Sequence, residues 1–338
     1  MDKLKVGVVG AGRIGKVHCE ALCSRVPDAE VVAVTDPRRE EAEKLASRFG
    51  IPAVSKNFEE LIQTEEIRAV VICSPTDTHR AYVEAAARAG KHIFCEKPLD
   101  HEPAVIRHLI EEVERNGVKL MVGYNRRFDP EFRQARLMVA SGEVGDIHIV
   151  RITSRDPEPP PFDYIKVSGG LFLDMAIHDF DMARFITGAE VVEVFARGAV
   201  LVDDRIGEAG DIDTAVVSLA FDNGALGTID DSRKAAYGYD QRLEVFGSEG
   251  MVRVENRLHN QNRLYNSGGI HKALPMDFFM DRYAEAYAIE MSAFVKSVID
   301  DSEVLVTAED GLRSIEIGLA ARKSWLENRP VRLEEIRG

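Results

Sequence analysis

Short runs rich in valine and isoleucine alternate with helical stretches between residues 4 and 125. The runs occupy residues 5–9, 31–35, 69–73, 92–95 and 120–123, and they are mostly apolar rather than alternately polar. Apolar strands separated by helices are typical of a parallel sheet that is buried on both faces. Two of the intervening helical stretches end at Gly50 and Gly90, and glycine commonly terminates a helix. We therefore predict a doubly wound parallel sheet for this part of the chain.

The pattern changes after about residue 145. Six strand-like runs follow one another with few helices between them, at residues 148–154, 193–202, 214–221, 225–230, 242–247 and 251–256. Turn sequences at 222–224 and 247–250 indicate antiparallel connections. We expect helices at roughly 174–187, 280–300 and 308–327. The prediction is an α/β domain over residues 1–122, then an α+β domain over 123–338 with a large, open, mainly antiparallel sheet.

Composition excludes several classes of protein. The chain has 338 residues, 43 basic against 57 acidic side chains and a net charge of -14, which disfavours binding to nucleic acid. No apolar run reaches the roughly 18–20 residues that span a membrane, and the charged N-terminus does not resemble a secretory signal. Four cysteines, at 19, 23, 73 and 95, do not make a disulfide framework. We expect a cytoplasmic enzyme with no membrane or nucleic-acid partner.

A glycine-rich turn follows the first predicted strand directly and opens a helix. Gly10 permits a tight turn, Gly12 lets the backbone approach a pyrophosphate, and Gly15 allows close packing of helix on strand. The N-terminus of the helix then attracts an anion. The pattern predicts a Rossmann dinucleotide site formed by residues Gly10, Ala11, Gly12, Arg13, Ile14 and Gly15. The alternative is that these glycines only form a turn.

Asp36 ends the second predicted strand, 21 residues past Gly15. A carboxylate at this place accepts hydrogen bonds from the adenosine ribose hydroxyls and repels a 2′-phosphate. The residue therefore favours NAD over NADP. Arg38 and Arg39 follow closely, and an arginine can neutralise a 2′-phosphate, so the preference is left open.

The ends of the strands predicted at 69–73 and 92–95 should border the same crevice, because ligands of a doubly wound sheet bind at the carboxyl ends of its strands. Thr78 can instead cap a helix over 79–89, and we expect His79 on the surface. Lys97 can present its charge to a substrate oxygen, although an ion pair at the protein surface is an equal alternative. The residues expected to line the cofactor are Ser74, Pro75, Thr76, Glu96 and Lys97.

Asp174 and His178 stand four residues apart, so on one helix they would share a face. A histidine beside a carboxylate can take a hydroxyl proton near neutral pH while hydride leaves the same carbon. Two alternatives compete with this general base. Asp179 and Asp181 could complete a metal site, as in a metal-dependent hydrolase, although zinc or iron would want another histidine. The histidine could also be structural, because its neighbours are apolar.

The order of these motifs resembles the Gfo/Idh/MocA oxidoreductase family over essentially the whole chain. The motifs are GAGRIG (10–15), Asp36, FCEKPL (94–99), GYNRRFDP (123–130) and DMAIHDFD (174–181). Within the family, segments 154–161, 167–185 and 237–250 are similar to the bacterial inositol dehydrogenases. The resemblance implies NAD-dependent oxidation of a ring hydroxyl of myo-inositol to an inosose. It leaves scyllo-inositol, D-chiro-inositol or glucose as alternative substrates, and a non-catalytic nucleotide-sensing regulator as an alternative of another class.

The resemblance also implies roles for single residues. Lys97, Asp174 and His178 correspond to the family's catalytic lysine, aspartate and histidine, and the family uses no metal. The Lys97–Pro98 bond is often cis in relatives. The implied substrate-binding residues are Lys97, Arg127, Asp156, Asp174, His178 and Tyr239, with Asp156 at a position where some relatives carry asparagine. Members commonly form homotetramers or dimers through the open sheet of the C-terminal domain.

Overall fold

The computed structural model describes residues 3–337 and divides the chain into two compact units. The first unit contains residues 3–128 together with 284–313, and the second contains residues 129–283 and 314–337. The expected boundary at 122/123 therefore lies six residues too early. The expected continuity of the second domain also fails, because segment 284–313 returns to the first unit.

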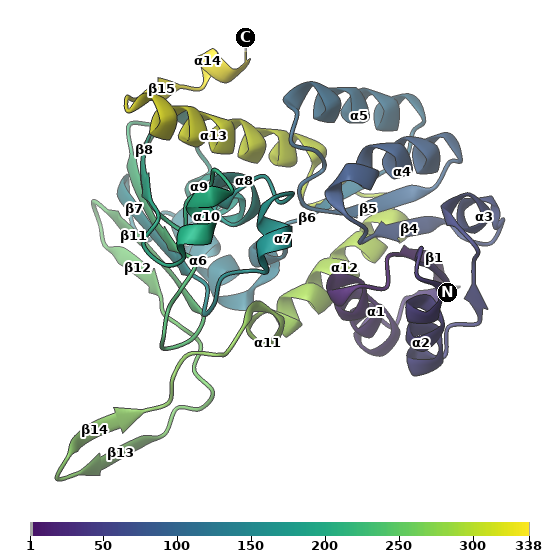
Figure 1. Cartoon of the computed structure of the whole chain (residues 1–338), viewed down its shortest axis with the longest axis horizontal. Helices are drawn as coiled ribbons and strands as arrows, with labels where there is room; N and C mark the ends of the chain where they lie inside the picture. The colour runs from purple at the N-terminus through teal and green to yellow at the C-terminus, as the bar shows by residue number, and fades with distance from the viewer. Residues whose placement is uncertain (1–2, 338) are drawn as a thin grey trace. The chain divides into compact units, whose positions relative to one another are not determined.

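A six-stranded parallel sheet forms the centre of the first unit, in the order β3-β2-β1-β4-β5-β6. The order reverses between β1 and β4, which is the point where ligands bind in such sheets. Helices α4 and α5 cover one face and α1 and α12 the other (Figure 1). The predicted doubly wound fold is confirmed. Its strands are β1 (Leu4–Val9), β2 (Ala29–Thr35), β3 (Ala53–Val54), β4 (Ala69–Ile72), β5 (His92–Glu96) and β6 (Leu120–Gly123).

The helices of this unit are α1 (Arg13–Arg25), α2 (Arg39–Phe49), α3 (Phe58–Gln63), α4 (Thr76–Arg88), α5 (Pro103–Arg115), the 3₁₀ turn η1 (Asn125–Phe128) and α12 (Ala284–Ile299). Helix α12 packs on α1 and η1. The ring of Tyr287 lies edge-on to His18 with ring centres 5.4 Å apart, and Phe294 reaches Phe94 at 5.8 Å. The sequence indicates that α12 is apolar, but not which sheet it covers, because that depends on contacts between distant segments.

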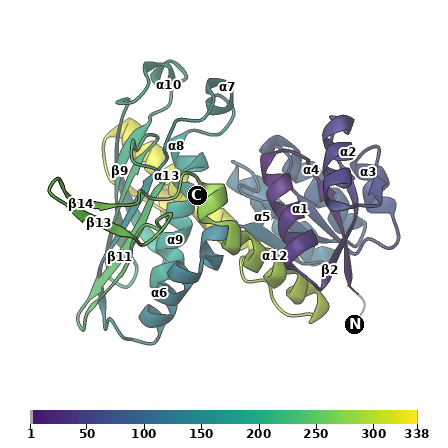
Figure 2. The ribbon, with the colours of Figure 1, turned by 90° about the horizontal axis from the view of Figure 1, so that it is seen from below.

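A seven-stranded sheet forms the centre of the second unit, in the order β12-β11-β7-β10-β9-β8-β15. All neighbouring pairs are antiparallel except β7 with β10. Helices α6 and α9 lie on one side of this sheet (Figure 2). The predicted open, mainly antiparallel sheet is confirmed. Its strands are β7 (Ile147–Arg155), β8 (Val191–Ala199), β9 (Thr214–Phe221), β10 (Leu226–Ser232), β11 (Asp240–Gly247), β12 (Met251–Val254) and β15 (Val331–Arg332), with a separate hairpin of β13 (Arg263–Asn266) and β14 (Gly269–Lys272).

The helix expected at 174–187 is divided into α8 (Leu171–Asp174) and α9 (Ile177–Thr187). The N–H of Ala176 donates to the Leu171 carbonyl five residues back, whereas the N–H of Asp179 donates to Ala176 three residues back. This change of hydrogen-bond spacing interrupts the helix. The other helices are α6 (Pro130–Ala140), α7 (Phe162–Ile165), α10 (Asp204–Glu208), α11 (Phe279–Arg282), α13 (Ala308–Glu327) and α14 (Glu334–Arg337). None of the helices within residues 3–337 combines the length and apolarity needed to cross a membrane.

Candidate active site

The glycine turn after β1 has the geometry of a dinucleotide-binding loop. Gly10 has φ +97°, and a Cβ there would lie 2.7 Å from the carbonyl oxygen of Cys73. A Cβ on Gly15 would lie 2.0 Å from the Gly10 oxygen, so α1 approaches β1 too closely for any side chain. Gly12 caps α1 without a side-chain hydrogen bond, and a Cβ there meets nothing within 4 Å. The space beside Gly12 is therefore open at the N-terminus of α1, which fits a bound pyrophosphate.

Asp36 is fastened to this turn. Its Oδ2 accepts the Ala11 N–H at 2.7 Å, and its Oδ1 accepts the Arg38 N–H at 2.8 Å. The Arg38 side chain also approaches, with Nε 3.5 Å from Oδ1. A carboxylate oxygen accepts more than one hydrogen bond, so ribose hydroxyls can still be bound. Beyond it, Arg38 and Arg39 line a recess together with Glu40 and Glu41, so both signs of charge lie beside Asp36.

The loop after β4 differs from the prediction. Helix α4 begins at Thr76, so Thr78 lies in its first turn, where its hydroxyl donates to the Pro75 carbonyl at 2.7 Å and contacts Ser74 Oγ at 2.6 Å. The prediction that His79 lies on the surface is wrong, because its side chain points inward from α4 and is 1% exposed. Its Nδ1 lies 2.8 Å from the Pro98 carbonyl oxygen and its Nε2 lies 2.8 Å from the Ser74 carbonyl oxygen.

His79 therefore joins the loop after β4 to the loop after β5. Burial lowers the pKa of its imidazole, while the two backbone contacts raise it by less. Ser74 and Thr76 are half-buried and Pro75 is exposed, so the loop itself remains accessible on the first unit. The sequence carried no signal for this contact, since a histidine in the first turn of a helix is usually solvated.

Glu96 makes a buried contact rather than a surface ion pair. Its Oε1 lies 2.6 Å from Nε2 of His18, a residue of α1 that is fully buried, and its Oε2 accepts the Lys97 N–H at 3.2 Å. A Cβ on Gly123 would lie 3.0 Å from the same carboxylate, so the backbone of β6 lies close to it. The carboxylate thus fixes the backbone of Lys97, whose side chain is half-buried. The Lys97–Pro98 bond is cis, as the resemblance implies.

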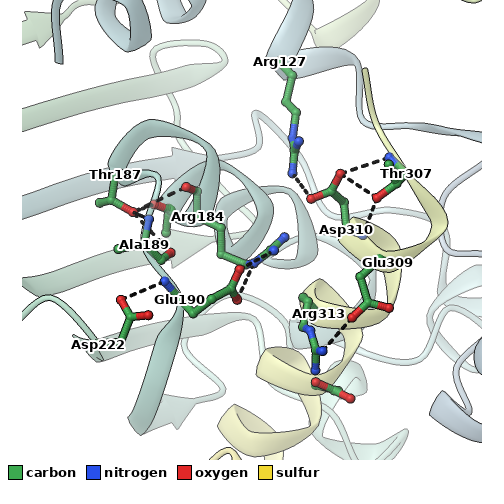
Figure 3. Close-up of polar contacts among 12 residues, drawn as sticks. Arg127, Arg184, Thr187, Ala189, Glu190, Asp222, Thr307, Glu309, Asp310 and Arg313 are labelled. Carbon is green, nitrogen blue, oxygen red and sulfur yellow. Dashed lines mark hydrogen bonds and ion pairs between the residues drawn. The ribbon is translucent and has the colours of Figure 1, made fainter. Parts of the chain in front are cut away.

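Arg127 lies in η1 and is held by a carboxylate from the segment that returns to the first unit. Its Nη2 is 3.0 Å from Oδ1 of Asp310, in the first turn of α13 (Figure 3). Asp310 also accepts the backbone N–H and the hydroxyl of Thr307, at 2.9 and 3.0 Å. Sequence reasoning missed Asp310. The Thr307–Asp310 spacing marks a helix start, but nothing in it points to an arginine 183 residues earlier.

Asp174 is held by two side chains that sequence reasoning also missed. The hydroxyl of Tyr164 donates to its Oδ1 at 2.8 Å, and Nη2 of Arg233 lies 3.3 Å from its Oδ2. Arg233 is 1% exposed, which makes it the largest fully buried side chain of the described residues. The preceding Gly170, with φ +82°, is needed because a Cβ there would lie 2.7 Å from the Asp211 carboxylate that caps α8.

His178 lies in the first turn of α9 and is half-buried. The prediction that it shares one continuous helix with Asp174 is wrong, because Asp174 ends α8. Asp179 and Asp181 are 0% and 1% exposed, so they point into the core rather than to solvent. Across residues 3–337, no group of three or more histidine, cysteine, aspartate or glutamate side chains is arranged to hold a metal.

Asp156 and Tyr239 occupy different surroundings in the second unit. Asp156 follows β7 and is half-buried, with its backbone bonded to Ser232 at 2.9 Å and to Ala235 at 2.7 Å. Tyr239 is 5% exposed. Its ring packs edge-on against Phe278 and Tyr283, with centres 6.2 and 6.0 Å apart. Most of the Tyr239 ring is therefore buried in the core of the second unit.

Comparisons with known proteins agree with this arrangement. The GFO_IDH_MocA model, described as an oxidoreductase family with an NAD-binding Rossmann fold, matches residues 4–124. The model of the GFO/IDH/MocA C-terminal domain matches residues 132–253. Together they match more than half of the chain.

Individual relatives are similar over almost their whole length. Myo-inositol 2-dehydrogenase of Thermotoga maritima is 48% identical over 99% of this chain and 100% of its own. Inositol 2-dehydrogenase of Rhizobium meliloti is 45% identical over 97% of this chain and 98% of its own. A crystal structure of scyllo-inositol dehydrogenase from Lactobacillus casei, with NAD(H) and scyllo-inositol bound, has a TM-score of 0.92 at 32% identity and covers 98% of this chain and 100% of that chain. The chain belongs to the Gfo/Idh/MocA oxidoreductase family, and its first unit is that family's NAD-binding Rossmann domain.

Proposed function

We propose that this chain is an NAD-dependent inositol 2-dehydrogenase that oxidises a ring hydroxyl of myo-inositol to the ketone, an inosose. The observation that carries the proposal is the 48% identity, over 335 residues, to a protein named myo-inositol 2-dehydrogenase. The first unit supports it with a loop that fits a pyrophosphate and with an acidic residue at the end of β2. Bound NAD would accept hydride from the carbon that carries the reacting hydroxyl.

We assign cofactor binding to the ends of the strands in the first unit. The amides of residues 10–15 would hold the pyrophosphate, and the Asp36 carboxylate would accept hydrogen bonds from the adenosine ribose. Asp36 already accepts hydrogen bonds from two backbone N–H groups, so its carboxylate is positioned before the nucleotide binds. The remaining cofactor-lining residues are proposed to be Ser74, Pro75, Thr76, Glu96 and Lys97.

We assign proton transfer to His178, which would act as the general base on the reacting hydroxyl. Asp174 would orient the substrate or the imidazole, and its contacts with Tyr164 and Arg233 leave it little freedom to move. Lys97, whose backbone is fixed by Glu96, would donate a hydrogen bond to the reacting oxygen. The roles proposed for these residues do not involve a metal ion.

The remaining substrate contacts are proposed to come from Arg127, Asp156 and Tyr239. Arg127 can donate to ring hydroxyls of a polyol, since its guanidinium has five N–H donors. Asp156 stands where some relatives carry asparagine. Its carboxylate would only accept hydrogen bonds from the substrate, whereas the asparagine amide can also donate one. This difference bears on which inositol stereoisomer binds best.

We also propose self-association through the open face of the seven-stranded sheet. A row of apolar side chains crosses five strands there in register, with Phe246 opposite Met251 and Ile149, and Leu226 opposite Ile149 and Ala220. Met251, Phe246 and Leu226 are 53%, 44% and 57% exposed. A continuous exposed apolar row marks a contact surface, which favours a homotetramer or dimer.

A cytoplasmic location completes the proposal. All four cysteines are free, and Cys19, Cys73 and Cys95 are buried. Burial raises the pKa of each of these three thiols. Free thiols are compatible with a reducing compartment.

A substrate panel tests the proposal. Initial rates of NADH formation are measured with myo-inositol, scyllo-inositol, D-chiro-inositol and glucose, each with NAD and with NADP. We expect the highest kcat/KM for myo-inositol with NAD. A higher kcat/KM for scyllo-inositol, D-chiro-inositol or glucose would change the substrate assignment and leave the proposed reaction type unchanged. No turnover with any polyol, although NAD binds, would favour the nucleotide-sensing regulator.

A further inference from the structure

Arg233 follows β10 directly and lies deep in the core of the second unit. Its side chain is 2% exposed, and its backbone N–H donates to the Asp213 carbonyl at 2.8 Å, which fixes the residue beside the start of β9. A guanidinium stays charged at every pH that a folded protein withstands. A permanent positive charge is therefore held away from water, and its burial costs free energy unless an anion lies close.

Asp174 is the anion that this guanidinium contacts. Nη2 of Arg233 lies 3.3 Å from Asp174 Oδ2, and the Asp174 side chain is 12% exposed. Nε of Arg233 is buried and has no hydrogen-bond partner among residues 3–337. A buried ion pair is stabilising only when its geometry is good and its remaining donors are satisfied. Stability alone therefore does not account for the pair, and a buried group left unsatisfied in this way points to a role in function.

The other titratable groups of the elements around Asp174 are acids, a neutral phenol and an imidazole. They are Tyr164 of α7, Asp211 before β9, His178 and Asp179 of α9, and Glu316 of α13. The Tyr164 hydroxyl donates to Asp174 Oδ1 at 2.8 Å, so it satisfies that oxygen without adding a charge. Lys166, at the end of α7, pairs with Asp163 instead. Arg233 therefore places a fixed positive charge directly on the second oxygen of Asp174.

A neighbouring cation holds a carboxyl group in its charged form, because it stabilises the anion and not the neutral acid. In the proposed reaction Asp174 has to accept a hydrogen bond from a substrate hydroxyl or from the His178 imidazole, and an ionised carboxylate only accepts. When His178 takes the hydroxyl proton, its imidazole becomes a cation. An ionised Asp174 stabilises that cation, whereas a protonated Asp174 does not.

We propose that Arg233 is a positioning residue of the reaction, a buried cation that keeps Asp174 ionised and fixes the orientation of its carboxylate. The Arg233 side chain has almost no exposed surface, so it acts through Asp174 rather than on the substrate. The inference rests on the roles proposed for Asp174 and His178, and it adds the residue on which both roles depend.

Two substitutions separate the charge of Arg233 from its hydrogen bonding. Arg233→Gln removes the charge and keeps an N–H donor, whereas Arg233→Lys keeps a charge and loses the planar fork. The matched control is Arg184→Lys, at a half-buried arginine of α9 that pairs with Glu190 at 2.6 Å (Figure 3). Circular dichroism verifies that each variant is folded.

The protonation of Asp174 is measured by infrared difference spectra between each protein and its Asp174→Asn counterpart, over a range of pH. We expect the band of the protonated acid to appear about one to three pH units higher in Arg233→Gln than in the wild type, because an opposite charge at this distance shifts a carboxyl by about that amount. Arg233→Lys should lie close to the wild type, and Arg184→Lys should match it. An unshifted band in Arg233→Gln would overturn the proposal.

Kinetics tests the link to the reaction. In Arg233→Gln, kcat/KM for myo-inositol should fall about 10–100-fold, and Arg233→Lys should recover part of this loss. The NAD dissociation constant should not change, since the residues assigned to NAD lie in the first unit. Added to Asp174→Asn, Arg233→Gln should cause little further loss, because Arg233 acts through the charge of Asp174. Additive losses would indicate a purely structural arginine and would reject the positioning role.

The design also covers a variant that does not fold and an enzyme that does not turn over. If Arg233→Gln is unfolded, Asp174→Asn is added to it. Recovery of folding would support the proposal, because the defect is then the unpaired anion, and a double variant that stays unfolded would reject it. A wild type that forms no NADH with any polyol would reject the proposed function, while the infrared shift would still decide whether Arg233 keeps Asp174 ionised.

Discussion

The Nδ1 atom of His79 lies 2.8 Å from the carbonyl oxygen of Pro98, so helix α4 is bonded directly to the loop that carries Lys97. The other ring nitrogen lies 2.8 Å from the carbonyl oxygen of Ser74, in the loop after β4. One buried imidazole therefore sets the spacing between two loops to which we assign cofactor binding. We predict that it acts as a positioning residue.

Replacing His79 with alanine should lower kcat/KM by about 10–100-fold, because both loops lose contact with a buried imidazole and one of them loses the hydrogen bond that its single N–H donates. His79→Gln should recover part of this loss, since its amide can still donate to one carbonyl. The matched control is His108→Ala on α5, whose side chain is 41% exposed. Steady-state kinetics on folded protein decides the matter. Equal kcat/KM values for His79→Ala and His108→Ala would show that the contact has no positioning role.

A substitution at Asp36 tests the preference for NAD over NADP. Asp36→Asn should weaken NAD about tenfold or more, because the charged acceptor of the ribose hydroxyls is lost, and it should weaken NADP far less. Asparagine keeps an oxygen for the Ala11 N–H, whereas its NH2 group cannot accept the Arg38 N–H. Adding Arg38→Ala should then lower whatever NADP affinity remains. Dissociation constants for both nucleotides are measured by fluorescence titration. An equal loss of NAD and NADP would refute the ribose role of Asp36.

The surroundings of Asp213 predict that the free energy of unfolding depends on pH in the acid range. Its side chain is fully buried and accepts the N–H groups of Leu201, Val202 and Asp203, at 2.8, 2.8 and 3.1 Å, and the Thr214 hydroxyl at 2.9 Å. Burial raises the pKa of this carboxyl, but the hydrogen bonds outweigh burial, so its pKa lies below the ordinary value.

A depressed pKa in the folded state stabilises the protein above the unfolded pKa of about 3.9, and the contribution is lost as pH falls through the folded pKa. Asp213→Asn should therefore lower the free energy of unfolding by about 1–3 kcal/mol at neutral pH. The difference from the wild type should shrink below about pH 4. Urea denaturation at several pH values measures it, with Asp204→Asn, an exposed neighbour, as the control. A difference that stays constant with pH would contradict the assignment.

Much of this architecture follows from local patterns, and the parts that do not are contacts between distant residues. The parallel strands, the glycine turn and Asp36 all depend on spacings within about 25 residues, which the sequence displays directly. The partners of the candidate residues do not. Arg233 reaches Asp174 across 59 residues, and Asp310 reaches Arg127 across 183. The return of α12 to the first unit is another such contact.

The division between α8 and α9 has a different cause. The spacing of Asp174 and His178 fits a helix, and both residues are helical. However, the Ala176 N–H donates to Leu171, five residues back, and the His178 N–H donates to Met175, three residues back. These unequal spans interrupt the regular helical hydrogen bonding between Asp174 and His178. Periodicity reports which residues are apolar, and it does not report a local change in the span of backbone hydrogen bonds.

The most direct test of the account compares the wild type with His178→Ala during oxidation of myo-inositol by NAD. NADH formation and NAD affinity are measured on the same preparations. We predict that the wild type forms NADH, and that the variant loses about 10²–10⁴-fold in kcat while its NAD dissociation constant changes little, because only proton removal is impaired. A His178→Ala protein with near-normal kcat would contradict the general-base assignment, and a wild type that forms no NADH from myo-inositol would contradict the proposed function.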